Sequence, residues 1–321
     1  MGIFTKEPTS RMLNDVGTLL VASGVKVDFK TQSLFFRGRI GETRIEAVPS
    51  GHRTPDQREV AETIRIQSDL KMPPLPWKED MQCVLNTSAS NGALFVEDGK
   101  VLIKSRLSLY AGESEQVMKV YAGVILFVAM MHTDAIQAAI VDMLKLPVAK
   151  ATVPPDSEAD SGWNPASFSR AASLLNESGA FANVDGGGLT AEFPWDPGAV
   201  SALTSLITGS RKCTSLLQVQ CEKHPSLGKG LLCRVDLPLH LTDTEAFRLS
   251  TSLNQMEFAA EDWPPFLGAW TSMPESGSPT FVGFWPDFFA KVIDVEMIAM
   301  WMAARARLLP GWLRDNTGVK Q

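Results

Sequence analysis

The sequence predicts an α+β protein built from two tandem modules, each with helices packed on an antiparallel sheet. Three observations support this: a proline-rich stretch near the middle of the chain, similar strings of residues on both sides of it, and the same order of predicted elements in both halves. At 321 residues the chain also exceeds the size at which a single hydrophobic core usually stops growing. Either half is long enough to bury a core of its own.

The proline-rich stretch covers residues 147–165 and contains four prolines among Ser, Asp, Glu and Gly. Because proline lacks a backbone donor and small polar residues bury little apolar area, this stretch is predicted to be a linker. The predicted modules are therefore residues 1–146 and 166–321.

The repeat is visible in three pairs of strings that occur in the same order in the two halves. They are LLVASG at 19–24 and LLNESG at 174–179, IQSDL at 66–70 and CRVDL at 233–237, and LN at 85–86 and 253–254. The distance between partners grows along the chain, as insertions in loops would produce. Each half also closes with a long apolar helix, predicted at 113–144 and 290–309.

The elements between these strings follow the order α-β-β-β-α-β-β-α in each module. In the first module we predict strands at 33–40, 43–48 and 63–70, a helix at 77–86, and strands at 93–97 and 101–109. The last two strands flank Asp98-Gly99, a strong signal for a type I′ hairpin turn. In the second module we predict helices at 167–176 and 242–258, the latter with a capping box from Thr242 to Glu245, and strands at 189–193, 215–221, 230–237, 267–273 and 280–285. A short extra helix is expected at 199–207.

One part of the first module resembles a known family. Residues 84–107 place Asn86 before the hairpin turn and follow it with Lys104-Ser105-Arg106-Leu107, and a long apolar helix comes after Gly112. This pattern resembles the bacterial YbjN-like family, which shares the fold of type III secretion chaperones. The resemblance implies a protein-binding role without catalysis, and it carries over no site residues. The second module keeps Asn254 but replaces the turn with residues 273–279.

Secretion chaperones pair two modules and wrap an extended segment of their client, so the resemblance implies that tandem copies could pair within one chain. The expected state is then a monomer that binds another protein or peptide segment.

Charge and cysteine content limit the compartment and the partners. Residues 1–150 carry a net charge of +1 and residues 151–321 carry −7. Because phosphate backbones and anionic membranes attract Lys and Arg, no nucleic-acid or membrane partner is expected. The longest apolar run, 120–131, is shorter than the roughly 20 residues that span a bilayer. With no secretory signal and four cysteines in the chain, we expect a cytoplasmic protein with free thiols.

Residues capable of chemistry are scattered, and none forms a known motif. Cys213, Cys221, His224 and Cys233 lack the paired spacing of zinc knuckles, so no metal is expected. His132 is interpreted as a surface or capping residue near a helix end, and the carboxylates of Glu257, Glu261 and Asp262 as a solvated face. The string DGGG at 185–188 is interpreted as a plain turn. The sequence therefore predicts no catalytic residue, no cofactor and no enzyme.

Tryptophans provide the candidate binding residues. Trp263, Trp270 and Trp285 lie beside prolines or β-rich runs in the acidic second half. Large aromatic residues are enriched at interface hot spots, and an open face or edge of an antiparallel sheet can accept an extended peptide. We therefore predict that these three residues form a partner-binding surface. The alternatives are a small-ligand-binding regulatory domain or an unrecognised enzyme.

Overall fold

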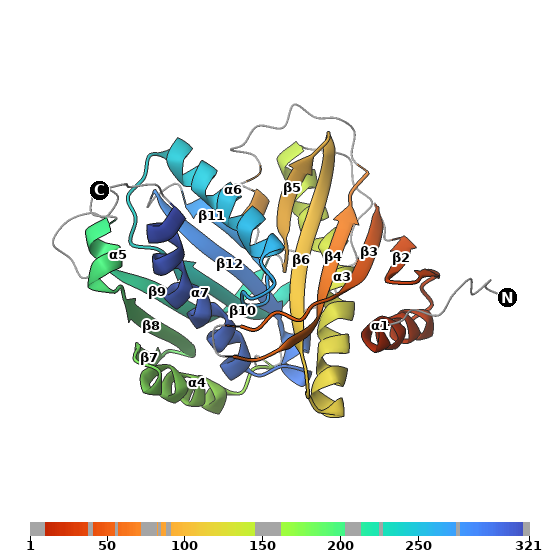
Figure 1. Cartoon of the computed structure of the whole chain (residues 1–321), viewed down its shortest axis with the longest axis horizontal. Coiled ribbons are helices and arrows are strands. Elements are labelled where there is room, and N and C mark those ends of the chain that lie inside the picture. The colour runs from red at the N-terminus through yellow and green to blue at the C-terminus, as the bar shows by residue number, and fades with distance from the viewer. Residues whose placement is uncertain are drawn as a thin grey trace. The chain divides into compact units, whose positions relative to one another are not determined.

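The computed structural model (Figure 1) describes residues 10–37, 41–54, 57–71, 82, 85–87, 91–144, 162–202, 213–224, 227–273 and 277–316. At 133–144, 197, 201–202 and 273 it describes the main chain alone. The chain divides into two compact units. The first comprises Met1–Ala151 with Asn254–Ala269, and the second comprises Thr152–Leu253 with Trp270–Gln321. Most of the predicted linker and most of the predicted helix at 77–86 lie outside the described residues.

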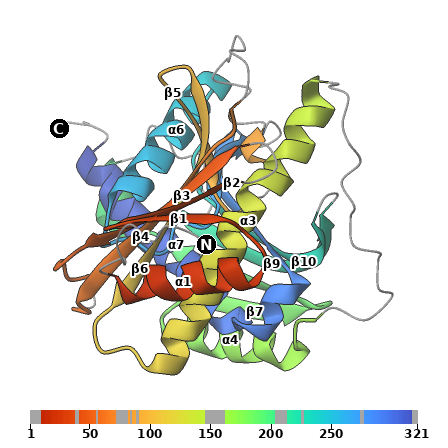
Figure 2. The ribbon, with the colours of Figure 1, turned by 90° about the vertical axis from the view of Figure 1, so that its right-hand side faces the viewer.

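The first unit is a six-stranded antiparallel sheet with helices on it. Its elements are α1 (Arg11–Ala22), β1 (Val27–Lys30), β2 (Ser33–Arg37), β3 (Glu42–Pro49), β4 (Val60–Asp69), β5 (Ala93–Glu97), β6 (Lys100–Tyr110) and α3 (Glu115–Leu144). The strand order is β1-β2-β3-β4-β6-β5. Helix α3 packs on β4 and β6, and α1 lies beside it (Figure 2). The predicted packing of the long helix on its own sheet is confirmed.

Local sequence accounts for the ends of these elements. The side chain of Ser10 caps α1 by accepting a hydrogen bond from the backbone N–H of Leu13. Asp98 and Gly99 have φ angles of 49° and 73°, which is the left-handed region that a type I′ turn requires. The predicted hairpin between β5 and β6 is therefore confirmed.

The second unit is a second six-stranded antiparallel sheet. The elements that follow α3 in the chain are α4 (Pro165–Glu177), β7 (Phe181–Asp185), β8 (Gly188–Pro194), α5 (Pro197–Ala202), β9 (Thr214–His224), β10 (Gly228–Asp236), α6 (Asp243–Ala259), β11 (Ala269–Met273), β12 (Ser278–Pro286), the 3-10 helix η1 (Asp287–Lys291) and α7 (Val295–Asn316). The strand order is β7-β8-β9-β10-β12-β11. Helix α7 packs on β8, β9 and β10, again as predicted, and α4 packs on β7 and β8.

Helix α6 carries the predicted capping box. The backbone N–H of Thr242 donates to Glu245 Oε2 at 2.9 Å, and the backbone N–H of Glu245 donates to Thr242 Oγ1 at 3.4 Å. The helix begins in the second unit and, from Asn254 onward, belongs to the first.

The two sheets share one strand order. In each, the first four strands follow the chain, and the last two are reversed so that the sixth strand pairs with the fourth. This agreement is consistent with two tandem modules, as the paired sequence strings predict.

Each sheet has one more strand than the sequence predicts. The additional strands, β1 and β7, stand at equivalent edges and hold only four and five residues. Asp, Lys and Asn within them are poor strand formers, so periodicity misses them. The DGGG string is the β7–β8 hairpin: Asp185 pairs with Gly188, and Gly186 and Gly187 take φ angles of 46° and 89°.

Apolar side chains between each sheet and its helices form the cores of the two units. Buried residues alternate along β4 and β10, so one face of each strand points to the helices. Within the described part of the chain, no helix is both long enough and apolar enough to cross a membrane.

Candidate functional site

The three tryptophans predicted to form a binding surface are buried. Trp263 is 9% exposed, and Trp270 and Trp285 are 0% exposed. Trp270 packs edge-on against Phe281 at 5.4 Å, and Trp285 packs against Phe289 at 5.3 Å. Every residue of β12 is buried, so neither face of that strand offers an exposed position. The predicted exposed aromatic surface is therefore wrong, while a binding role for these residues stays a prediction.

The apolar side chains that are exposed in the second unit include two on its edge strand. Phe181 is 62% exposed and Val184 is 42% exposed, and both lie on β7. No described strand pairs with the outer edge of β7. The equivalent strand β1 is different: it ends in Lys30, and its Phe29 ring lies against Gly17 of α1. Charged residues are one means by which proteins protect sheet edges, and β7 carries one, Asp185, where β1 carries two, Asp28 and Lys30.

One residue of β7 has its outward main-chain groups bound by a side chain. Asn176, near the end of α4, accepts a hydrogen bond from the N–H of Ala182 at 2.8 Å and donates to its carbonyl at 3.1 Å. A carboxamide has the same donor and acceptor as a peptide unit. At Ala182, Asn176 therefore holds the position that one peptide unit of an added strand would hold.

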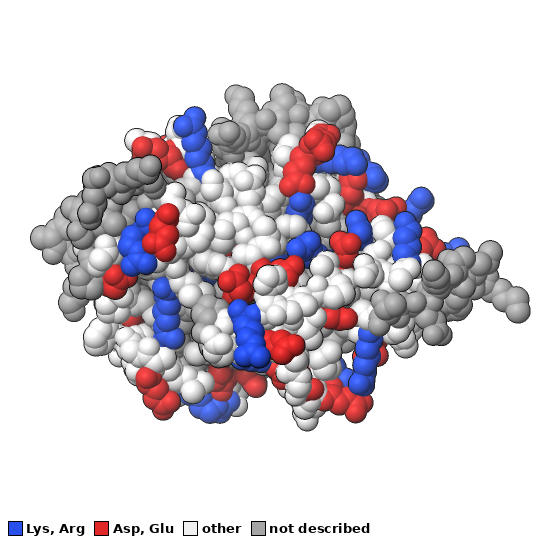
Figure 3. Space-filling model, in the orientation of Figure 1, with Lys and Arg blue, Asp and Glu red and all other residues white. Residues whose placement is uncertain are grey.

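Three carboxylates lie on or next to β7, and Arg307 of α7 reaches the same region, where it donates to the carbonyl of Ser178 at 3.0 Å. Glu177, Asp185 and Glu192 form no ion pair with any described residue, and Glu192 lies directly across from Phe181 on β8. The one basic residue of the segment 165–194 is Arg170, which is paired with Glu296. On the face drawn in Figure 3, the charges of both signs are interspersed. The β7 edge thus combines an exposed phenylalanine with unpaired carboxylates.

In the first unit, a stretch of irregular chain covers the part of β6 that extends beyond β5. Arg106 in β6 exchanges two main-chain hydrogen bonds with Phe266, at 3.1 and 2.7 Å. Glu257 is fully buried there, and Glu261 pairs with Arg65 at 3.4 Å. The expectation of a solvated face is therefore wrong for Glu257, whereas Glu261 is half-buried and Asp262 is exposed. Arg65 and Glu261 are far apart in the sequence, so no local sequence pattern predicts that they form an ion pair.

A buried polar chain crosses the core of the first unit. His132 on α3 is 1% exposed, which corrects its interpretation as a surface or capping residue. Its Nδ1 lies 3.2 Å from Ser68 Oγ, and its Nε2 lies 2.6 Å from Ser105 Oγ. Ser68 Oγ in turn lies 2.8 Å from Thr43 Oγ1. Burial lowers the pKa of His132 to about 3, although a hydrogen bond to the main chain of Asn91 acts in the opposite direction.

The contact between Ser105 and Asn91 determines which groups donate and which accept in this polar chain. Ser105 Oγ donates its single proton to the carbonyl of Asn91. Nε2 of His132 then carries the ring proton, which Ser105 Oγ and the carbonyl of Asn91 share, and Nδ1 accepts from Ser68. The imidazole is neutral, with both nitrogens satisfied.

A serine beside an imidazole could suggest nucleophilic catalysis, but the surroundings do not favour it. Ser105 is fully buried, and a Cβ added at Gly92 would lie 2.6 Å from its Oγ and 2.8 Å from His132 Nε2. The space that a substrate carbonyl would need beside Ser105 is therefore taken by the main chain of Gly92.

The second unit lacks the polar chain at the equivalent positions. When β4 and β10 are matched at their final aspartates, Ser68 corresponds to Val235. The strand partners then match Thr43 with Leu217, and Ser105 with Gly283. The fold forms with apolar residues at these positions, so the polar chain is a property of the first unit alone.

The three cysteines that the structure describes lie around β9 and β10 and form no disulfide, while Cys83 lies outside the described residues. Cys233 is buried, Cys213 is half-buried and Cys221 is exposed. Burial raises the pKa of the Cys233 thiol. Among the described residues, no group of three or more His, Cys, Asp or Glu side chains could hold a metal ion.

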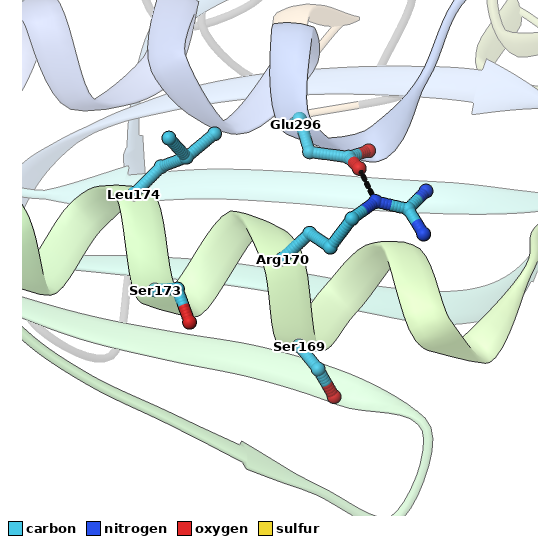
Figure 4. Close-up of a pocket in the computed structure, with 5 residues that line it drawn as sticks. All are labelled: Ser169, Arg170, Ser173, Leu174 and Glu296. Atoms are coloured by element: carbon cyan, nitrogen blue, oxygen red, sulfur yellow. Dashed lines mark hydrogen bonds and ion pairs between the residues drawn. The ribbon is translucent and has the colours of Figure 1, made fainter.

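A shallow hollow of about 400 Å³ lies between α4 and α7. It is lined by Ser169, Arg170, Ser173, Leu174 and Glu296. Figure 4 shows Arg170 reaching from α4 to Glu296 on α7, where Nε donates to Oε1. The other carboxylate oxygen, Oε2, is buried without a hydrogen-bond partner. Such an oxygen could accept from an amine or amide.

Comparisons of the chain with protein-family models, with curated proteins and with solved structures give no match.

Proposed function

We propose that the protein is a non-catalytic protein-binding module, a chaperone-like or regulatory adaptor of a bacterial cytoplasm. It takes up an extended segment of its partner along β7. The observation that carries this proposal is the exposed Phe181 on β7, an edge strand whose outer edge pairs with no described strand. Strand addition combines main-chain hydrogen bonds with side-chain anchors, and Phe181 would supply the anchor.

The chain itself provides a precedent for this mode of binding. In the first unit, Phe266 pairs with Arg106 through main-chain hydrogen bonds at a sheet edge. In the second, Asn176 offers one amide to the main chain of Ala182. The edge of the first sheet thus binds a peptide group of the main chain, and the edge of the second sheet binds the carboxamide of a side chain.

The resemblance to the YbjN-like family supports the same role. It rests on the residues around Asn86 and the Asp98-Gly99 turn, and on the duplication. We infer that each module derives from the order α-β-β-β-α-β-β-α with one further edge strand. In this account neither nucleic acid nor a membrane is a partner, because the second half is acidic.

Two variants should change partner binding in opposite directions. Phe181→Lys removes the anchor and adds a charge that protects the edge, so we expect a loss of about thirtyfold in affinity, the size of a hot-spot effect. Asn176→Ala removes the side chain that a partner strand must displace, so we expect binding to strengthen by up to about tenfold. Quantitative affinity capture of the partner by each purified variant measures both changes.

The matched control is Asp28→Lys on β1, the equivalent edge of the first unit. It should leave capture unchanged, and thermal melting should show that all three variants fold. If Phe181→Lys captures the partner as well as the parent does, β7 is not the binding edge.

The second candidate function is small-ligand binding. It is favoured by the hollow between α4 and α7 and by the unpartnered Glu296 Oε2. A ligand there would be bound equally well by the parent and by Phe181→Lys, so the same variant separates the two functions.

A further inference from the structure

Residues 254–269 contact the rest of the first unit, residues 1–151, as a peptide ligand contacts its receptor. The segment runs in the chain from the end of α6 to the start of β11, and most of it has no regular secondary structure. Strand β5 pairs with β6 only as far as Lys104, and Phe266 pairs with Arg106 immediately beyond that point. The segment therefore continues the sheet edge where β5 stops.

The main chain of the segment is bound by one buried arginine. Arg106 is 0% exposed, and its guanidinium donates to the carbonyls of Glu257 at 3.0 Å, Trp263 at 3.1 Å and Pro264 at 2.7 Å. Ser108 Oγ donates to the carbonyl of Glu261 at 3.1 Å. These contacts recognise the path of the backbone rather than the identity of its side chains.

Proline suits the segment to this arginine. Pro264 and Pro265 have no N–H groups, and their rings hold φ in the extended range. Such a stretch presents carbonyl acceptors without competing donors. The five N–H donors of a guanidinium are complementary to it.

Side-chain contacts fix the register of the segment. The Phe258 ring lies 5.8 Å from Phe95 and 6.5 Å from Phe266. The ammonium of Lys104 lies over Phe258 at 5.1 Å.

A carboxylate of the segment also contacts the strands and loops of the first unit. Glu261 accepts from Ser50 Oγ at 2.9 Å and from Arg65 Nη2 at 3.4 Å. The bound sequence thus has a carboxylate and a Pro-Pro pair with an aromatic residue on either side of them.

We propose that this face of the first unit is a peptide-binding site, which residues 254–269 fill within the chain and which a partner segment of the same chemistry can fill in their place. The partner is a segment with one aromatic residue on a helical turn, followed by irregular chain that carries an acidic residue, a Pro-Pro pair and a second aromatic residue. This site is separate from β7 and lies on the other unit, so it does not rest on the function proposed above.

The test uses the full chain and a synthetic peptide with the sequence of residues 254–269. The double variant Glu261→Gln with Phe266→Ala weakens the internal segment but leaves the receptor residues unchanged. In the parent the internal segment occupies the site for most of the time and so lowers the apparent affinity for the peptide. The double variant frees the site, and the peptide should bind it at least about tenfold more tightly than it binds the parent. Isothermal titration calorimetry measures both affinities, and a peptide with serine in place of Phe258 and Phe266 should not bind.

A folded double variant that does not bind the peptide would show that the segment is an inseparable part of the core, and the proposal would be overturned. If the double variant does not fold, Glu261→Gln alone provides the same test, because the Glu261 side chain is partly exposed. Equal binding of the native and serine-substituted peptides would also contradict the proposal.

Discussion

Replacing Arg106 by leucine should lower the free energy of unfolding by about 3 kcal/mol or more, because each buried carbonyl that loses its donor costs about 1–3 kcal/mol. The guanidinium is fully buried and donates to three main-chain carbonyls. Leucine would leave these carbonyls without their donor in a site that water does not reach. Urea denaturation of the parent and the variant measures the difference.

Arg65→Leu is the matched control, because Arg65 lies directly across from Arg106 on β4. The side chain of Arg65 is 32% exposed, and its ion pair with Glu261 is 3.4 Å long. A pair of this kind contributes about 1 kcal/mol or less. Equal losses in the two variants would mean that the carbonyl contacts of Arg106 contribute little.

Lowering the pH from 7 to 4.5 should destabilise the protein through His132 by about 2–3 kcal/mol. Burial lowers the pKa of His132 to about 3 in the folded protein, from 6.5 when the imidazole is free. The unfolded chain therefore binds the proton first as the pH falls. The stabilisation is complete above pH 6.5 and decreases as the pH drops toward 3.

His132→Gln isolates this contribution. The amide keeps one donor and one acceptor for the neighbouring hydroxyl groups but does not titrate. The variant should be less stable than the parent at pH 7, and it should lose less stability on acidification. Chemical denaturation at several pH values measures both, with His52→Gln as a control because the His52 side chain is 71% exposed. Parallel pH profiles for the parent and His132→Gln would exclude His132 as the cause.

Local signals in the sequence predicted much of the fold. The Asp98-Gly99 turn and the Thr242 capping box each act over a few residues, and both are present in the structure. The long final helices follow from their length and apolar composition. The edge strands β1 and β7 were missed because short strands with polar residues have no clear alternation.

The candidate sites depended on contacts that no local pattern encodes. Trp270 and Trp285 lie on strands as predicted, but the open face or edge expected for their sheet suggested exposure, and both side chains are fully buried. The pairing of Arg106 with Phe266 joins residues far apart in sequence. In hindsight, the string LLNESG contained a signal, because its asparagine is the residue that binds the main chain of β7.

The central claim, that a partner lies along β7, is tested most directly by photo-crosslinking in the cells that make the protein. A photoreactive amino acid is placed at position 181 in one protein and at position 28, on the equivalent strand β1, in another. The account predicts that position 181 crosslinks to one extended segment of a partner protein, identified by mass spectrometry, and that position 28 does not. The absence of a crosslink at 181, or the same crosslinks at both positions, would contradict it.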